Sequence, residues 1–173
     1  MRLLQTLTVL FGLAALPMMA SADPLAVGAA APKLTAVDQD GKSVDFGAVY
    51  AKGTTLVYFY PKAKTPGCTK EACSIRDNWS KMKEAGIQVL GVSEDPKELQ
   101  KEFANEQNLP FQLIADTDGK VAQAFGVPFM GKVTKRQSFL IKDGKVVWNM
   151  LDKTSTDKHA EDVLKADVDT KKG

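Results

Sequence analysis

An unbroken run of aromatic, β-branched and aliphatic residues, 54–60, constrains the fold of this 173-residue chain more than any other feature. It reads Thr-Thr-Leu-Val-Tyr-Phe-Tyr, without the polar and apolar alternation of a strand that has one face in water. Such a run is typical of a central strand buried on both faces, and Pro61 ends it. The chain is therefore expected to build a sheet that is covered on both sides.

A long helix is predicted directly after this strand. Apolar or weakly polar side chains recur there at spacings of three and four residues, as in one buried helical stripe. The stripe consists of Cys68, Ala72, Ile75, Trp79 and Met82, and Gly86 marks its end. Cys68 is thus expected on the core-facing side of the helix, at its beginning, and Trp79 in the core.

The rest of the chain alternates strand and helix patterns. Further strands are predicted at residues 34–37, 43–46, 87–92, 111–115, 137–141 and 146–150, with Asp-Gly turns at Asp40 and Asp143. Further helices are predicted at residues 96–108, with Asp95 as N-cap, and at residues 120–125 and 156–166. This order predicts a thioredoxin-like α/β fold: a central mixed sheet flanked by helices, with an N-terminal β-hairpin and an antiparallel edge.

The first 22 residues have the pattern of a cleaved signal peptide. Arg2 precedes a mostly apolar stretch, Pro17 interrupts it, and Ala20-Ser-Ala22 provides small residues before Asp23. A retained membrane anchor is the weaker interpretation, because polar residues break the apolar stretch before it reaches spanning length. Residues 23–173 are then expected to form one domain, periplasmic or secreted, with no membrane attachment after cleavage.

The charge balance excludes two classes of partner. The chain has 23 basic and 21 acidic residues, for a net charge of +2. A nucleic-acid-binding protein or one that binds an anionic membrane surface normally carries a marked basic excess. Neither nucleic acid nor a membrane surface is therefore expected as a partner.

The chain has two cysteines, Cys68 and Cys73, separated by five positions. A helix N-terminus favours a thiolate, so Cys68 is placed to be reactive. On an intact helix, Cys73 is rotated by roughly 140° from Cys68, with the two Cα atoms roughly 8 to 9 Å apart. A disulfide needs about 4.4 to 6.8 Å. The two thiols are thus expected to face different ways and to pair only if the helix start unwinds.

Other readings of the cysteines are weaker. A structural disulfide closing so small a loop would contribute only about 2 kcal/mol and would distort a helix. A metal site lacks ligands, because the lone histidine, His159, is distant in sequence and expected at the surface. Lysines 62, 64 and 70 could add positive potential near Cys68, but a solvated loop is the favoured interpretation.

The segment Pro61-x-x-x-Thr65-x-x-Cys68, continued by Thr-Lys-Glu-Ala-Cys73, resembles the active-site motif of the peroxiredoxins. Within that family it is similar to the subfamily called bacterioferritin comigratory protein or peroxiredoxin Q. The resemblance covers nearly all of residues 23–173 in element order.

The resemblance implies a role for each matching residue. Cys68 would be the peroxidatic cysteine and Cys73 the resolving one. Arg136 would stabilise the thiolate and the transition state, Thr65 would hydrogen-bond the sulfur or the peroxide, and Pro61 would shield the thiolate. Glu71 would orient the arginine. No metal, haem or flavin is implied.

The implied activity is a peroxidase of hydrogen peroxide and small organic hydroperoxides, serving antioxidant defence. Cys68 would become a sulfenic acid and then a disulfide with Cys73, which a thioredoxin-like protein would reduce. The family resemblance implies a monomer. Two alternatives stay open: a thiol-disulfide oxidoreductase acting on proteins, and a non-enzymatic redox-sensing module. Residues 128–133, which precede Arg136, match no pattern, so the preferred peroxide is left open.

Overall fold

The computed structural model describes residues 23–152 and 156–172, and the predicted signal peptide lies outside them. The centre is a five-stranded sheet in the order β5-β4-β3-β8-β9. Its strands are β3 (Thr55–Phe59), β4 (Gln88–Ser93), β5 (Gln112–Ala115), β8 (Gln137–Lys142) and β9 (Lys145–Met150). β3, β4 and β5 are parallel, whereas β8 and β9 are antiparallel to their neighbours. The mixed sheet with an antiparallel edge confirms the predicted fold class.

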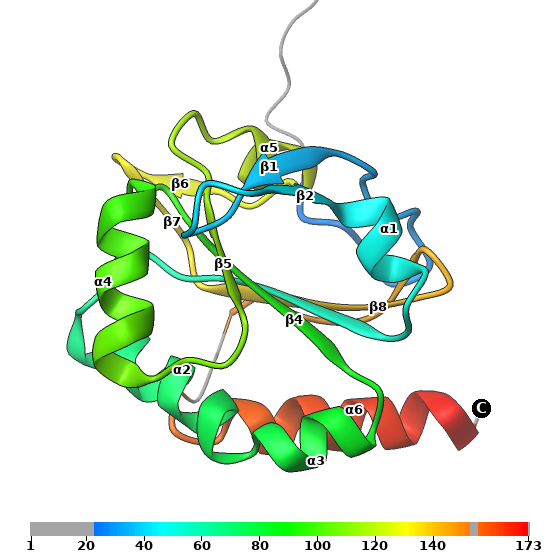
Figure 1. The fold of residues 1–173 in the computed structure, drawn as a ribbon. Helices are drawn as coiled ribbons and strands as arrows, with labels where there is room; N and C mark the ends of the chain where they lie inside the picture. The colour runs from blue at the N-terminus through cyan, green and yellow to red at the C-terminus, as the bar shows by residue number, and fades with distance from the viewer. Residues whose placement is uncertain (1–22, 153–155, 173) are drawn as a thin grey trace, which may run out of the picture.

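Helices cover both faces of this sheet (Figure 1). They are α1 (Phe46–Tyr50), α2 (Pro66–Asp77), α3 (Trp79–Glu84), α4 (Lys97–Gln107), α5 (Lys120–Ala124) and α6 (His159–Lys172). Two short hairpins lie outside the sheet, β1 (Thr35–Val37) with β2 (Ser43–Asp45), as predicted, and β6 (Phe129–Met130) with β7 (Val133–Thr134). Within the described part of the chain, no helix is both long and apolar enough to span a bilayer.

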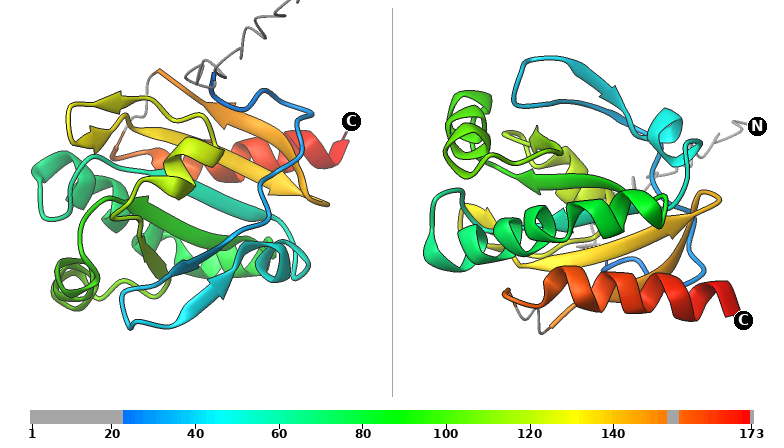
Figure 2. Two further views of the ribbon diagram at one scale, coloured as in Figure 1. Left: turned by 90° about the horizontal axis from the view of Figure 1, so that it is seen from above. Right: turned by 60° about the horizontal axis from the view of Figure 1, so that its bottom comes forward.

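The central strand β3 is buried along its whole length and contributes to two cores, one on each face of the sheet. Leu56 and Tyr58 point into the core that contains Cys68, while Val57 and Phe59 point into the opposite core. This follows from the alternation of side chains along a strand. Figure 2 shows the two coverings, with α2, α3 and α6 on one face and the N-terminal segment with α5 on the other. The prediction of a two-sided central strand is confirmed.

The helix after β3 differs from the prediction because it is broken. α2 ends at Asp77 and α3 begins at Trp79, with Asn78 between them outside helical geometry (φ −102°, ψ 14°). The Asn78 side-chain amide donates to the Ser74 carbonyl at 3.0 Å and competes there with the backbone ladder. The buried stripe nevertheless continues across the break, since Met82 is fully buried.

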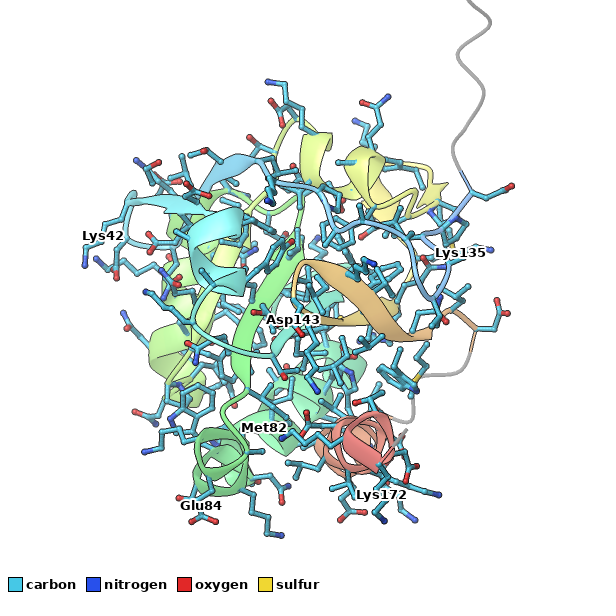
Figure 3. The ribbon with its side chains drawn as sticks, turned by 90° about the vertical axis from the view of Figure 1, so that its right-hand side faces the viewer. Lys42, Met82, Glu84, Lys135, Asp143 and Lys172 are labelled. Atoms are coloured by element: carbon cyan, nitrogen blue, oxygen red, sulfur yellow. The ribbon has the colours of Figure 1, made fainter. Side chains whose placement is uncertain are left out.

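The last helix lies further along the chain than predicted. It was expected at residues 156–166, but α6 runs from His159 to Lys172. In its last turn, Lys171 pairs with Asp167 at 2.6 Å and also donates to the Ala85 carbonyl. Figure 3 shows the result: the ends of α3 and α6, marked by Glu84 and Lys172, lie side by side beneath the sheet.

A close approach between strands at Gly91 yields a stability prediction. Gly91 on β4 pairs with Tyr58, and a Cβ there would lie 2.7 Å from the Tyr58 hydroxyl and 2.8 Å from a Leu113 methyl carbon. Since both neighbours are fully buried, Gly91→Ala should lower the free energy of unfolding by about 1 to 3 kcal/mol, measured by urea denaturation. Gly47→Ala is the control, because its methyl would meet only the exposed side chains of Asp45 and Lys33, at 3.2 and 3.6 Å, and should change stability by less than about 1 kcal/mol. Equal losses in the two variants would contradict the steric explanation.

Candidate functional site

Cys68 is the third residue of α2 and is 2% exposed, facing the core. The helix begins there because Pro66 occupies its first turn, where a missing backbone N–H costs nothing. The first helical hydrogen bond runs from the Thr69 N–H to the Thr65 carbonyl, so the Cys68 N–H is left free of the helical ladder. A sulfur at this point lies in the positive end of the helix dipole, which favours a thiolate.

Arg136 reaches this sulfur from the residue before β8. Its Nη2 lies 3.2 Å from Cys68 Sγ, and its Nη1 pairs with a carboxylate oxygen of Glu71. Burial lowers the pKa of the guanidinium, but Glu71 and Cys68 outweigh that effect and raise the pKa above its ordinary value. Arg136 is therefore a fixed cation shared between a sulfur and a carboxylate.

Gly67 leaves room for this cation. A Cβ at Gly67 would lie 3.4 Å from Arg136 Nη2, so the guanidinium packs against the first turn of α2. Pro61, at the other end of the loop, is half-buried. The guanidinium therefore lies against both the Cys68 sulfur and the first turn of α2.

The loop that carries Thr65 is bound through its neighbours Ala63 and Lys64 to α4 and to the residues just before α4. The Thr65 hydroxyl, expected to contact the sulfur or the peroxide, donates to the Lys62 carbonyl at 2.9 Å. The Ala63 N–H donates to the Asp95 carboxylate at 2.6 Å. Lys64, in the left-handed region (φ 63°), pairs with two glutamates of α4.

Two of these contacts correct the sequence analysis. Asp95 was predicted to cap α4, but its side chain binds Ala63 and Ser93 instead, and Pro96 precedes the helix without a side-chain cap. Lys64 is not simply solvated, since it has ion pairs with Glu102 and Glu106. Both residues tie the loop to neighbouring elements.

Cys73 lies in different surroundings from Cys68. It is half-buried, and its Sγ is 3.5 Å from the Gln107 side-chain oxygen at the end of α4. Arg76, which also pairs with Asp77, donates to the Gln107 carbonyl at 2.7 Å. Both cysteines are free thiols. The structure is thus that of the reduced protein, with an intact α2 between the two sulfurs.

His159 is not at the surface, as the sequence analysis expected; it is fully buried. Its Nε2 lies 2.9 Å from the Ser138 hydroxyl, and its Nδ1 lies 3.0 Å from the second carboxylate oxygen of Glu71. These polar neighbours offset the cost of burying the ring. A signal was present in the sequence, because His159, Ala160, Val163 and Ala166 follow helical spacing and form the buried face of α6.

Residues 128–133, which match no pattern in the sequence, contribute most of the hairpin of β6 and β7, with Gly131 in the left-handed region at its turn (φ 70°). Phe129 and Met130 are exposed there. The Thr134 N–H donates to the Glu94 carboxylate at 3.0 Å, two residues before Arg136. Across residues 23–152 and 156–172, no three His, Cys, Asp or Glu side chains gather as a metal site would require.

Comparison with known proteins agrees with this geometry. Residues 27–149 match the model of the AhpC/TSA family. The chain is 44% identical over 150 residues to peroxiredoxin Bcp of Escherichia coli, covering 82% of this chain and 95% of that protein. It is 40% identical over 141 residues to a chloroplastic peroxiredoxin Q of Oryza sativa, covering 80% of this chain and 64% of that protein.

Solved structures show the same relationship. Peroxidoxin BcpB of Mycobacterium tuberculosis superposes with a TM-score of 0.78 at 34% identity, covering 83% of this chain and 96% of the other. Peroxiredoxin Q of Xanthomonas campestris superposes with a TM-score of 0.73 at 31% identity, covering 79% and 90%.

Proposed function

Because the chain belongs to the AhpC/TSA family and is a peroxiredoxin, a thiol-dependent peroxidase, we propose that it reduces hydrogen peroxide and small organic hydroperoxides at Cys68. The observation that carries this proposal is the contact of 3.2 Å between Arg136 Nη2 and Cys68 Sγ at the start of α2. The bacterioferritin comigratory protein of Xanthomonas campestris, whose solved structure is 28% identical with a TM-score of 0.73, has alkyl peroxide reduction activity, which supports the inclusion of organic hydroperoxides.

In the oxidation step, the Cys68 thiolate attacks one peroxide oxygen, forming an S–O bond as the O–O bond breaks. The departing oxygen carries negative charge until it takes a proton and leaves as water or alcohol. Cys68 becomes a sulfenic acid. The Arg136 cation, which contacts both Cys68 and Glu71, stabilises the developing charge. Thr65 and Pro61 hold the loop around the sulfur.

In the resolution step, the Cys73 thiol attacks the Cys68 sulfenic acid, releasing water and forming a disulfide. Residues five apart on an intact helix have Cα atoms roughly 8 to 9 Å apart, beyond disulfide range. The first turns of α2 must therefore unwind, and the contact of Cys73 with Gln107 must break. A thioredoxin-like dithiol protein then returns two electrons and restores both thiols.

The setting of the reaction is part of the proposal. The signal-like N-terminus supports a periplasmic or secreted protein, and the balanced charge supports the absence of nucleic-acid and membrane partners. A monomer is proposed from the resemblance to the peroxiredoxin Q subfamily alone. There the enzyme would contribute to antioxidant defence, and its disulfide would need a dedicated reductant, since such compartments favour disulfides.

The two alternatives are not favoured by the family or by the site. A thiol-disulfide oxidoreductase presents its nucleophile to a protein substrate, but Cys68 is 2% exposed. A non-enzymatic redox-sensing module would not need a cation in contact with the sulfur. The small, enclosed sulfur site fits a small oxidant instead.

Rapid mixing tests the proposal. Reduced protein is mixed with one equivalent of hydrogen peroxide or with an oxidised protein disulfide, and the product is mapped by mass spectrometry. We expect peroxide to yield a Cys68–Cys73 disulfide within seconds, with bulkier hydroperoxides tested next and thioredoxin-type reductants tried on the product. Fast oxidation by the protein disulfide together with inertness toward peroxide would instead establish the oxidoreductase.

A further inference from the structure

Behind Cys68, a chain of polar contacts leads away from the sulfur into the core. Arg136 contacts Cys68 and Glu71, Glu71 contacts His159, and His159 contacts Ser138. Glu71, Ser138 and His159 are fully buried. The mechanism above uses the first two links, to Arg136 and Glu71, and leaves the histidine unexplained.

Glu71 divides its two oxygens between these partners. One oxygen pairs with Arg136 and the other lies 3.0 Å from His159 Nδ1. The ring nitrogen does not meet hydrogen-bond geometry toward this oxygen, so the pair is a close polar contact, and neither atom has a hydrogen-bond partner among the described residues. A buried carboxylate oxygen without a polar neighbour is costly. The histidine therefore fixes which way the carboxylate lies.

His159 is itself anchored on two sides. Ser138 contacts its Nε2 from β8, two positions after Arg136, so alternation along the strand places both side chains on the same face. Tyr58 packs its ring edge-on against the imidazole, with centroids 5.6 Å apart. The next residue, Ala160, donates its N–H to Ser74 of α2 at 3.2 Å. α6 is thereby docked on the helix that carries Cys68 and Glu71.

We infer that His159 is a positioning residue of the peroxidase site, which holds Glu71 so that Glu71 can hold Arg136 against Cys68. This inference deepens the proposed function and rests on it. His159 does not touch the sulfur and transfers no proton in this role. It contributes through the orientation of one carboxylate.

Two amide variants of His159 separate the contribution of Nδ1, which faces Glu71, from that of Nε2, which faces Ser138. In His159→Asn the amide nitrogen can occupy the place of Nδ1 and still face Glu71, whereas in His159→Gln the amide reaches the place of Nε2 and Ser138. We expect the rate constant for oxidation of Cys68 by hydrogen peroxide to fall about tenfold in His159→Gln and less than about threefold in His159→Asn. Equal rates in both variants and the wild type would overturn the inference.

A second readout distinguishes positioning from general loosening of the fold. Alkylation of Cys68 by iodoacetamide needs a thiolate but has no departing peroxide oxygen to stabilise. Measured where both rates have reached their high-pH limit, alkylation should change less than about twofold in His159→Gln while peroxide oxidation falls about tenfold. A parallel fall in both rates would show a structural role only.

A double variant tests whether His159 acts through Glu71. If His159 acts by holding the carboxylate, Glu71→Gln with His159→Gln should oxidise no more slowly than Glu71→Gln alone. A full further tenfold loss in the double variant would contradict this route through Glu71. The wild-type protein separates this test from the test of the proposed function. If the wild type does not react with peroxide, the proposed function is wrong. If the wild type reacts and the His159 variants react equally fast, only the role of His159 is wrong.

Discussion

Replacing Cys68 with serine is expected to abolish peroxide turnover, with a loss on the order of a thousandfold or more. A hydroxyl at this position cannot supply the thiolate that the helix start and Arg136 are placed to stabilise. Cys73→Ser should behave differently, since Cys73 lies beside Gln107 and away from the cation. It should keep one rapid oxidation and then stop. The measurement is rapid mixing with one equivalent of hydrogen peroxide, followed by trapping with a sulfenic-acid reagent.

The trapped species decides the assignment. Cys73→Ser should accumulate a sulfenic acid on Cys68, because no second thiol can condense with it, whereas the wild type should show the disulfide. Both substitutions exchange sulfur for oxygen at nearly constant shape, so unchanged thermal melting is the control for folding. A sulfenic acid trapped on Cys73 in the Cys68→Ser variant would reverse the two roles.

The sequence predicted the fold well because its strongest signals are local and periodic. Residues 54–60 and the stripe from Cys68 to Met82 carry patterns that depend only on the period of a strand or helix. The Asp-Gly turn at Asp143 is equally local, since Asp143 and Gly144 both adopt positive φ (52° and 72°) at the tip of the hairpin (Figure 3).

What the sequence did not predict depends on partners from distant segments. The polar neighbours of the buried His159 are Glu71 and Ser138, which lie on another helix and a strand, so the helical spacing around His159 could indicate its burial but not these partners. Asp95 has the local pattern of a helix cap, but the loop N–H of Ala63 competes for its carboxylate. Both wrong predictions concern residues that hold the site in place, where tertiary contacts override the local sequence preference for a helix cap or a surface position.

Replacing Arg136 with methionine, an unbranched side chain without charge, should slow oxidation of Cys68 by about a hundredfold or more. Arg136→Lys should recover only part of this loss, because the guanidinium reaches Cys68 and Glu71 at once through separate nitrogens, and a single ammonium cannot. The measurement is the rate constant for reaction with hydrogen peroxide, taken with peroxide in excess.

Arg136→Met should also destabilise the protein, since it strips a cation from the fully buried Glu71 carboxylate. Loss of one partner from such a pair costs on the order of 3 kcal/mol, so a slower variant could simply be a less folded one. Adding Glu71→Gln removes the uncompensated charge and should restore most of the free energy of unfolding. The oxidation rate should stay low in this double variant, because nothing then stabilises the departing oxygen. Recovery of the rate together with stability would mean that Arg136 acts by supporting the fold and not by contacting the reaction.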